Sequence, residues 1–322
     1  MTVILKYTPE AIKSAAQTIK NGGIVAFPTE TVYGVGASAF DPDAIIRIYE
    51  IKKRPRFDPL IVHISSLADL EELTLGIDKQ CATLIEKFWP GPLTLVLNKS
   101  SNVPDIVTAG LNTIAVRMPD HKIALELVTE SGVPIAAPSA NMFGSLSPTA
   151  AEHVIKQLGE KVDIIIDGGK TKIGVESTIL DMTGEPTILR PGGVSVEDIE
   201  KIIGKVKILT YKKRPSSPGQ LPKHYAPRIP LKIIENGDSI SVNTHNAGLI
   251  AFKKPPKKVN FKKVEVLSPT GDLKEAACNL FSILHRLESS GVEMIYVEKV
   301  PEVGLGVAIM DRLRKAGGLK NG

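Results

Sequence analysis

The sequence predicts an α/β protein of two domains joined by a proline-rich connector. Its 322 residues exceed what one ordinary core needs, and strand-like and helix-like patterns alternate along it. Residues 215–230 also contain five prolines, a density typical of an extended, semi-rigid segment. We therefore place the first domain at residues 1–208, the connector at 209–230 and the second domain at 231–322.

The first domain is predicted to alternate helices and strands from its beginning. An amphipathic helix spans residues 9–21, and a strand follows at 24–27. Asp41 is a good N-cap for a second helix, which runs into the basic segment 52–56. A capping-box pattern opens a later helix over residues 195–204. Between these helices, short apolar runs predict buried strands at residues 60–64, 93–97, 114–117, 134–137, 162–166, 178–181 and 187–189.

The second domain repeats the same kind of alternation on a smaller scale. Its helix over residues 273–287 places apolar side chains on one face, an almost complete amphipathic match. A last helix is expected to end near Gly317. Four short strands are predicted, at residues 231–234, 248–252, 264–267 and 294–297. The pattern is that of a small α/β domain.

Composition and spacing argue against several classes of protein. The chain is 43% hydrophobic and 23% charged, as folded globular proteins are. It shows no signal-peptide pattern and no apolar run long enough for a membrane helix, so we expect a cytoplasmic protein without membrane contact. Two cysteines cannot build a disulfide framework, and the six histidines lack metal spacing. We therefore expect no metal site built by the protein.

The strongest single signal is the run Lys52-Lys53-Arg54-Pro55-Arg56, which places four cations in five residues. The dipole of the preceding helix explains one or two of them. Four cations beside an apolar strand repel one another unless a polyanion neutralises them. The run therefore predicts a phosphate-binding segment, with a solvated basic turn as the alternative. The net charge of +5 permits a polyanionic partner without requiring one.

Two further segments place small and hydroxyl-bearing residues directly after a predicted strand, where open α/β sheets bind ligands. Residues 28–36 combine two threonines with two glycines. Residues 136–149 are rich in serine, and they lead into a helix over 149–158 whose first N–H groups could hold an anion. Each segment alone is equally compatible with ordinary turn and capping chemistry. Together with the basic run they indicate a phosphate-bearing substrate.

Several of these segments resemble the YrdC family, and they occur in the family's order over most of residues 10–200. The matching motifs are Pro28-Thr29-Glu30-Thr31-Val32-Tyr33-Gly34, Lys52-Lys53-Arg54-Pro55, Trp89-Pro90-Gly91-Pro92-Leu93-Thr94, Ala115-Val116-Arg117-Met118-Pro119, Ser139-Ala140-Asn141 and Leu189-Arg190-Pro191-Gly192. The rest of the chain resembles the long, two-domain form of the family, the threonylcarbamoyl-AMP synthases. The motifs there are Ser217-Pro218-Gly219, Lys223-His224-Tyr225-Ala226-Pro227 and Gly304-Leu305-Gly306…Asp311-Arg312-Leu313. The resemblance implies a twisted, open, mixed-sheet YrdC-like catalytic domain followed by a smaller Rossmann-like α/β domain.

The resemblance also implies a reaction, in which L-threonine, bicarbonate and ATP give L-threonylcarbamoyl-adenylate and pyrophosphate. A downstream transferase then moves the threonylcarbamoyl group to an adenosine of tRNA, forming N6-threonylcarbamoyladenosine. No carboxylate pair suited to Mg²⁺ is evident, so the ion is expected to arrive on the ATP phosphates. Direct contact with tRNA stays open.

Each motif carries a role that the resemblance implies. Lys52 and Arg56 are expected to act on the ATP phosphates, as the two indispensable cations of the basic run. The other ATP-binding residues are expected to be Thr113, Ala137, Ser139, Asn141, Ser147, Arg190 and Tyr225. Threonine is expected to be held by Thr29, His63, Arg117 and Ser177. Tyr225, in the connector, is expected to reach back over the nucleotide as part of a lid.

Two alternatives remain at this point. A carbamoyl-adenylate-forming maturation enzyme shares the YrdC domain, but such proteins carry acylphosphatase-like and zinc modules, for which this chain has neither the length nor the cysteines. A non-catalytic RNA-binding protein of the translation machinery would hold RNA phosphates with the basic run and the lysine-rich second domain. Pyrophosphate release that requires both L-threonine and bicarbonate distinguishes the enzyme from the binder.

Overall fold

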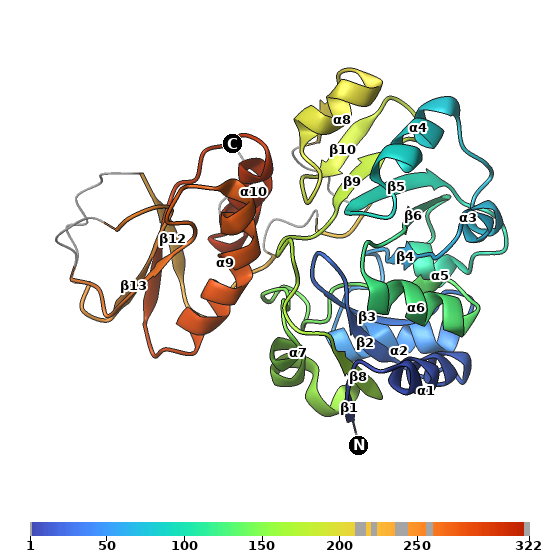
Figure 1. The fold of residues 1–322 in the computed structure, drawn as a ribbon, viewed down its shortest axis with the longest axis horizontal. Coiled ribbons are helices and arrows are strands. Elements are labelled where there is room, and N and C mark those ends of the chain that lie inside the picture. The colour runs from blue at the N-terminus through green and yellow to red at the C-terminus, as the bar shows by residue number, and fades with distance from the viewer. Residues whose placement is uncertain (1, 210–216, 220–223, 236–243, 256–259, 319–322) are drawn as a thin grey trace.

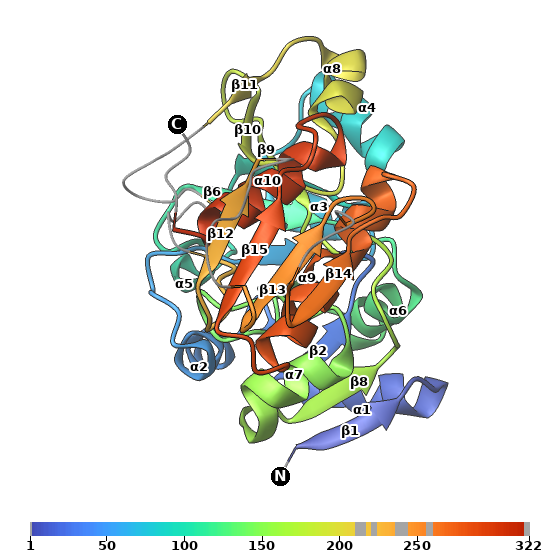
Figure 2. The same cartoon turned by 90° about the vertical axis from the view of Figure 1, so that its left-hand side faces the viewer.

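The computed structural model describes residues 2–209, 217–219, 224–235, 244–255 and 260–318 (Figure 1). It contains two α/β units, a large one built on a mixed sheet and a smaller one built on a parallel sheet. The smaller unit stands beside the larger one and turns its helices toward it (Figures 1 and 2). The predicted fold class is confirmed.

Eleven of the described strands form the large sheet, in which neighbours in space are seldom neighbours in sequence. Their order across the sheet is β1 (Val3–Lys6), β8 (Ile164–Asp167), β2 (Val25–Pro28), β3 (Tyr33–Ser38), β7 (Ile135–Ala136), β4 (Ile61–His63), β6 (Thr113–Arg117), β5 (Leu93–Asn98), β9 (Thr178–Asp181), β10 (Thr187–Arg190) and β11 (Lys207–Ile208). The sheet is mixed, with parallel pairs such as β1 with β8 and antiparallel pairs such as β2 with β3.

The middle of this sheet brings distant segments together. β4 pairs with β6 in parallel, so that His63 lies beside Arg117. β5 pairs antiparallel with β6, so the start of β5 lies beside the end of β6. β9 pairs in parallel with β5, so its start lies at the same edge of the sheet. The chain that leaves β7 turns back over the centre, where the Ala137 N–H donates to the Ile61 carbonyl (2.9 Å). Strand ends from separate motifs therefore converge on one place.

Both faces of the sheet are covered, because alternate residues of a strand point to opposite sides. Val25 and Phe27 of β2 enter an apolar cluster with α1 (Pro9–Lys20) and α6 (Lys122–Ser131). Ala26, between them, enters the cluster on the other face. The helices that contribute to this second cluster are α2 (Pro42–Lys52), α3 (Leu67–Leu73), α4 (Lys79–Phe88), α5 (Asp105–Thr108), α7 (Ala151–Leu158), which the 3₁₀ turn Gly159–Lys161 follows, and α8 (Val196–Ile203).

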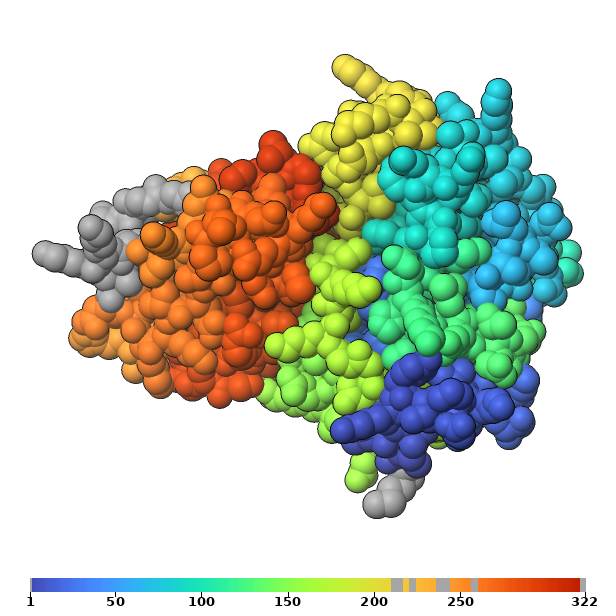
Figure 3. All heavy atoms as spheres, in the orientation of Figure 1, coloured from blue at the N-terminus to red at the C-terminus, as the bar shows by residue number. Residues whose placement is uncertain are grey.

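The second unit has a four-stranded parallel sheet in the order β12 (Leu231–Ile234), β15 (Met294–Glu298), β13 (Ala247–Ala251) and β14 (Lys263–Val266). Helices α9 (Leu273–Glu288) and α10 (Leu305–Ala316) lie between this sheet and the first unit (Figure 1). The apolar cluster around Phe281 includes Val32 and Val175 of the first unit, so the contact between the units is part of a buried core. In Figure 3 the orange surface of the second unit meets the yellow-green segment that follows β8.

Most predicted elements are confirmed within a residue or two, and a few interpretations were wrong. Residues 28–36 are not one loop, because β3 begins at Tyr33 and only residues 29–32 form the turn. The helix expected over 149–158 begins at Ala151, and no side chain caps it, so Thr149 lies outside the helix. Its hydroxyl lies 3.0 Å from that of Ser282 on α9 instead. Asp41 caps α2 as predicted, accepting from the N–H groups of residues 43 and 44.

Elements with weak sequence patterns were missed. They are β1, β11, α3, α4, α5 and α6. Among the residues described, no helix combines the length and apolar character that a membrane crossing requires.

Candidate functional site

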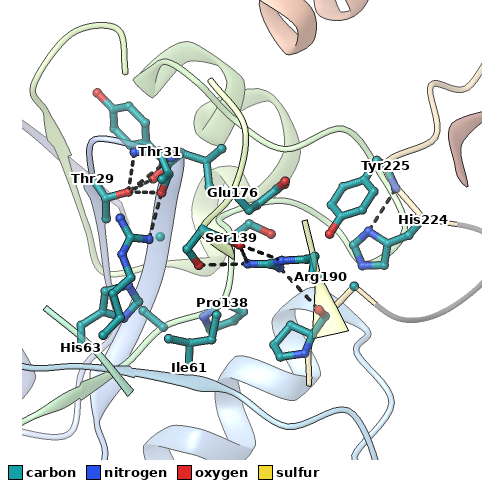
Figure 4. A pocket seen from close by; sticks show the side chains of 18 of the residues that line it. Thr29, Thr31, Ile61, His63, Pro138, Ser139, Glu176, Arg190, His224 and Tyr225 are labelled. Atoms are coloured by element: carbon teal, nitrogen blue, oxygen red, sulfur yellow. Dashed lines mark hydrogen bonds between the residues drawn. The ribbon is translucent and has the colours of Figure 1, made fainter. Parts of the chain in front are cut away.

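A pocket opens over the centre of the large sheet, with the connector along one side (Figure 4). Thr29, Thr31 and His63 gather at one end of it, while Glu176, Arg190 and Tyr225 gather at the other. The other lining residues are Val32, Tyr33, Gly34, Arg54, Ile61, Arg117, Ala137, Pro138, Ser139, Ser177, Pro218, Gly219 and His224.

The first end of the pocket is organised by Arg117 at the end of β6. Its Nε donates to the Gly91 carbonyl (3.1 Å), and its Nη1 donates to Thr31 Oγ1 (3.0 Å). Thr31 Oγ1 is in turn 2.8 Å from the hydroxyl of Thr29, which donates to the Val32 carbonyl (2.7 Å). Arg117 is therefore held in one orientation by the turn after β2.

Glu30 lies against the remaining nitrogen of Arg117. The Arg117 Nη2 and Glu30 Oε1 atoms are 2.5 Å apart, and both side chains are buried. Their contact is an ion pair by distance, but within the described residues neither Nη2 nor the two carboxylate oxygens meets the geometry of a hydrogen bond. This end of the pocket thus keeps polar atoms that a ligand could satisfy.

His63 is neutral in this environment. Burial, and then the positive charge of Arg117, lower its pKa from 6.5 to about 3. Its Nδ1 atom is buried and has no hydrogen-bond partner among the described residues. A neutral imidazole with one free ring nitrogen can donate to or accept from a bound ligand, according to its tautomer.

The basic run divides into two buried and two exposed cations. Lys52 ends α2, and Lys53 adopts the left-handed conformation (φ 52°) that terminates the helix. Lys52 is 1% exposed, and its Nζ donates to the carbonyls of Ser139 and Asn141. Arg54 is buried at the pocket, whereas Lys53 and Arg56 are exposed and do not line it.

Arg54 has an acidic partner nearby. It forms an ion pair of 2.9 Å with Asp58 one turn later, and it also donates to the Asp58 and Pro59 carbonyls. Of the cations in the run, we expected Lys52 and Arg56 to be the essential two, yet the structure brings Arg54 to the pocket in place of Arg56. The spacing of Arg54 and Asp58 was the available signal.

Arg190, at the end of β10, faces the other end of the pocket. Its Nε and Nη2 donate to the Ser177 carbonyl (3.1 and 3.0 Å), and Nη2 also donates to the Ser177 hydroxyl (3.1 Å). Ser177 is fixed by Thr94, whose hydroxyl is 2.8 Å away. Burial lowers the pKa of Arg190, and no carboxylate lies within ion-pair distance of it in the described chain.

Glu176 and Tyr225 complete this end. Ser147 donates to one carboxylate oxygen of Glu176, and Arg312 of α10 donates to the other (2.7 Å). Burial works against ionisation of Glu176, but the charges of Arg312 and Arg190 outweigh it and lower its pKa. Tyr225 is buried with φ 60°, and burial raises its pKa to about 12, so it is a neutral phenol.

The charges around the pocket do not balance. Arg54 faces Asp58, Arg117 faces Glu30, and a cluster of two cations and two carboxylates joins α10 to Glu176. Lys52 and Arg190 are left, both almost wholly buried and without a carboxylate partner in the described residues. Buried charges are costly unless compensated, so this pocket favours an anionic ligand.

The structure places the sequence-predicted site residues in two groups. Those that line the pocket are Thr29, His63, Arg117, Ala137, Ser139, Ser177, Arg190 and Tyr225. Those that do not are Lys52, Arg56, Thr113, Asn141 and Ser147. Asn141 shapes the loop that the pocket shares, because its Nδ2 donates to the carbonyls of Met142 (2.9 Å) and Ser145 (2.8 Å). Thr113 lies half-buried at the start of β6.

Sequence reasoning gave no role to Arg54, Glu176 or His224, which do line the pocket. His224 is buried against the rings of Phe143 and Tyr225.

The centre of the mixed sheet thus carries a pocket lined by a buried arginine without a described carboxylate partner, as in proteins whose sites suit small anionic ligands. Residues 17–192 match the family of Sua5, YciO and YrdC, described as telomere recombination. Residues 194–318 match the family described as the C-terminal domain of threonylcarbamoyl-AMP synthase. The chain therefore belongs to the YrdC family, in the two-domain form of the threonylcarbamoyl-AMP synthases.

Relatives match almost the whole chain. A threonylcarbamoyl-AMP synthase of Pyrococcus abyssi is 48% identical over 96% of this chain and 94% of its own length. The one from Bacillus subtilis is 42% identical over 95% and 93%. The crystal structure of P. abyssi Sua5 complexed with L-threonine has a TM-score of 0.91 at 43% identity, covering 99% of this chain and 98% of that one. The structure of full-length HypF in the phosphate- and nucleotide-bound form shares only the fold. It has 19% identity and a TM-score of 0.52, and the match covers 58% of this chain and 30% of that one.

Proposed function

We propose that this protein forms L-threonylcarbamoyl-adenylate and pyrophosphate from L-threonine, bicarbonate and ATP. The observation that carries the proposal is Arg190, a buried cation that lines the pocket and has no described carboxylate partner, with the buried Lys52 behind the loop that carries Ser139. The names of the relatives and the L-threonine in the P. abyssi structure support the choice of substrates.

L-Threonine is assigned to the end organised by Arg117. A guanidinium binds a carboxylate as a two-pronged fork, and Arg117 is held in place by Gly91 and Thr31. Thr29, neutral His63 and Ser177 supply polar groups around it. Arg117 lines the pocket, and Glu30 lies behind it as its buried ion-pair partner.

ATP is assigned to the end at Arg190, Ser139 and Tyr225. In the reaction, the amino nitrogen of L-threonine first bonds to the carbon of bicarbonate with loss of one water. An oxygen of this N-carboxylated threonine then attacks the α-phosphorus. The new O–P bond forms as the bond from that phosphorus to the bridging oxygen breaks, and the electron pair leaves with pyrophosphate. Negative charge grows on the leaving oxygens, and positioned cations stabilise it. Arg190 and Arg54 face the pocket directly, while Lys52 acts from beneath the loop that carries Ser139.

Mg²⁺ belongs to the ATP in this proposal. The carboxylates nearest the pocket, Glu30, Asp58 and Glu176, each face an arginine. Among the residues described, no group of three or more His, Cys, Asp or Glu side chains could hold a metal ion. The ion would neutralise part of the phosphate charge, and the chain's own residues would bind and orient what it carries.

We further propose that the product serves a downstream transferase that modifies tRNA adenosine to N6-threonylcarbamoyladenosine, in the cytoplasm. The test is pyrophosphate release measured with L-threonine and bicarbonate present together and each omitted in turn. The proposal expects release only with both. Release without L-threonine would point to a different acceptor, and tight RNA binding with no release would point to an RNA-binding protein.

A matched pair of variants assigns the cations. Lys52→Met removes the buried cation, and Lys53→Met removes its exposed neighbour from the same turn. We expect the first to lose roughly tenfold or more in kcat/KM for ATP, the scale of one lost hydrogen bond to a charged group, and the second to stay near native. Equal activity of the two variants would contradict the role given to Lys52.

A further inference from the structure

Helix α10 of the second unit reaches the back of the pocket without lining it. Arg312 is 1% exposed, and its Nε donates to Glu176 Oε2 (2.7 Å) while its Nη2 donates to the Pro191 carbonyl (3.0 Å). Its guanidinium also lies 4.8 Å from the centre of the Tyr225 ring. One side chain of the second unit thus touches three parts of the wall that surrounds Arg190.

Two neighbours on α10 anchor this arrangement. Asp311 accepts from Arg312 Nη1 (2.5 Å) and from Lys315 Nζ (2.9 Å). Lys315 also donates to the Gly219 carbonyl (2.8 Å) in the connector. The helix therefore holds the connector and Glu176 by the same set of charges, all of them buried.

Glu176 is the residue on which this arrangement bears most directly. It precedes Ser177 in the chain, and the carbonyl of Ser177 accepts two hydrogen bonds from Arg190. Glu176 and Arg190 also line the same end of the pocket (Figure 4). After Arg312, Arg190 is the next cation whose charge acts on the Glu176 carboxylate.

We propose that Arg312 is a positioning residue for anion binding. By occupying Glu176, it keeps Arg190 without a carboxylate partner, and Arg190 remains available to the phosphates of a ligand. The second unit thereby sets the affinity of a site it does not line. The identity of the ligand as ATP rests on the proposed function. That the ligand is an anion follows from the geometry alone.

The removal of Arg312 has a specific consequence in this scheme. A buried carboxylate that loses its cation takes another partner where one is within reach, because an unpaired buried charge is costly. Glu176 would then pair with Arg190 and compete with the ligand. The defect should fall on ATP and pyrophosphate, while L-threonine, at the Arg117 end, is spared.

The test is a double-mutant cycle with Arg312→Met, Glu176→Gln and the two together. ATP and inorganic pyrophosphate are titrated into each purified full-length protein by calorimetry, and KM is measured for ATP and for L-threonine. Arg312→Met should weaken ATP and pyrophosphate roughly 10- to 100-fold, the range for losing one hydrogen bond to a charged group. The double variant should recover most of that loss, since its Glu176→Gln change removes the competing charge.

Controls separate this role from simple structural support. Arg314→Met removes a partly exposed arginine of the same helix that pairs with Glu302, and should bind ATP as the native protein does. Arg312→Lys keeps the charge with fewer donors and should fall between native and Arg312→Met. Thermal melting identifies any variant that fails to fold. If Arg312→Met does not fold, ATP binding by Arg312→Lys is compared with that of the native protein, and native-like binding overturns the inference.

The outcomes are distinguishable. Native-like ATP binding by Arg312→Met overturns the inference, and so does a double variant that stays as weak as Arg312→Met. A native protein that binds pyrophosphate but not ATP would remove the proposed function. In that case a pyrophosphate loss in Arg312→Met, recovered in the double variant, would still support the role of Arg312.

Discussion

Two stacked histidines at the contact between the units make stability depend on pH. The rings of His153 on α7 and His285 on α9 lie 3.8 Å apart at 18°. The Thr149 N–H donates to His153 Nδ1 (3.2 Å), and His285 Nε2 lies 3.1 Å from the Ser147 carbonyl, to which it donates. Burial lowers the pKa of both rings, and that of His153 falls to about 3.

The other charges around His153 act in the same direction. His285, Lys156, Lys170 and Arg286 all disfavour its protonation, whereas Glu152, 3.8 Å away, is largely exposed and opposes them weakly. In the unfolded chain His153 takes a proton near pH 6.5, while in the folded chain it does so only near pH 3. Between these values the unfolded state binds the extra proton, so acidification favours unfolding.

The expected magnitude follows from that difference. From about pH 7.5 to about pH 5, His153 alone should remove about 2 kcal/mol from the free energy of unfolding. The perturbation is His153→Phe, which keeps a flat ring against His285 but cannot titrate. Its absolute stability will differ from the native value because the Thr149 N–H loses its acceptor, so only the change between the two pH values is compared.

The assay is urea unfolding followed by circular dichroism at both pH values. The native protein should lose about 2 kcal/mol more than His153→Phe between them. His245→Phe serves as the control, because that histidine is exposed and lies outside the contact. Equal losses in the native protein and His153→Phe would refute the reasoning.

Three further predictions concern the pocket and the core. Thr31→Val removes the acceptor of Arg117 Nη1 and should raise KM for L-threonine roughly tenfold in a steady-state assay without changing KM for ATP. Gly219 has a φ of +82°, and a Cβ added there would lie 2.3 Å from Tyr225 Oη, so Gly219→Ala should weaken ATP binding measured by calorimetry. Gly184 has open space around it, and Gly184→Ala should leave ATP binding unchanged. Phe281→Ala empties a wholly buried site in the core shared by the units and should cost about 3–5 kcal/mol in urea unfolding, against little for the exposed Phe57→Ala.

The sequence predicted the alternation of elements well, because periodicity and end signals are local. The prediction was wrong where contact between neighbouring strands outweighs the intrinsic strand propensity of the residues. β3 contains Gly34 and Gly36 and so lacks a strand-like composition, yet a Cβ at Gly36 would lie 2.5 Å from Ile135 Cγ2 on the neighbouring strand β7. Gly36 is needed because any side chain there would collide with residues of the neighbouring strand, a long-range contact that the sequence alone does not reveal.

The site could be predicted by motif but not by orientation. In the basic run, the left-handed residue Lys53 directs Lys52 and Arg54 inward and leaves Arg56 outside, and no periodic pattern describes such a turn. Glu176 gave no local signal, because its partner Arg312 is 136 residues further along the chain. Long-range ion pairs of this kind are visible only in the folded molecule.

The position of β8 bears on how the protein is made. β1 and β2 are among the first strands synthesised, but each pairs with β8, which ends at Asp167. Arg190 and Tyr225 follow later, and Arg312 lies in the final helix. Pairings over such sequence distances form slowly. During translation β2 can pair with β3 early, but β1 has no partner until β8 has been made, and the pocket as described cannot assemble until the ribosome has passed Tyr225.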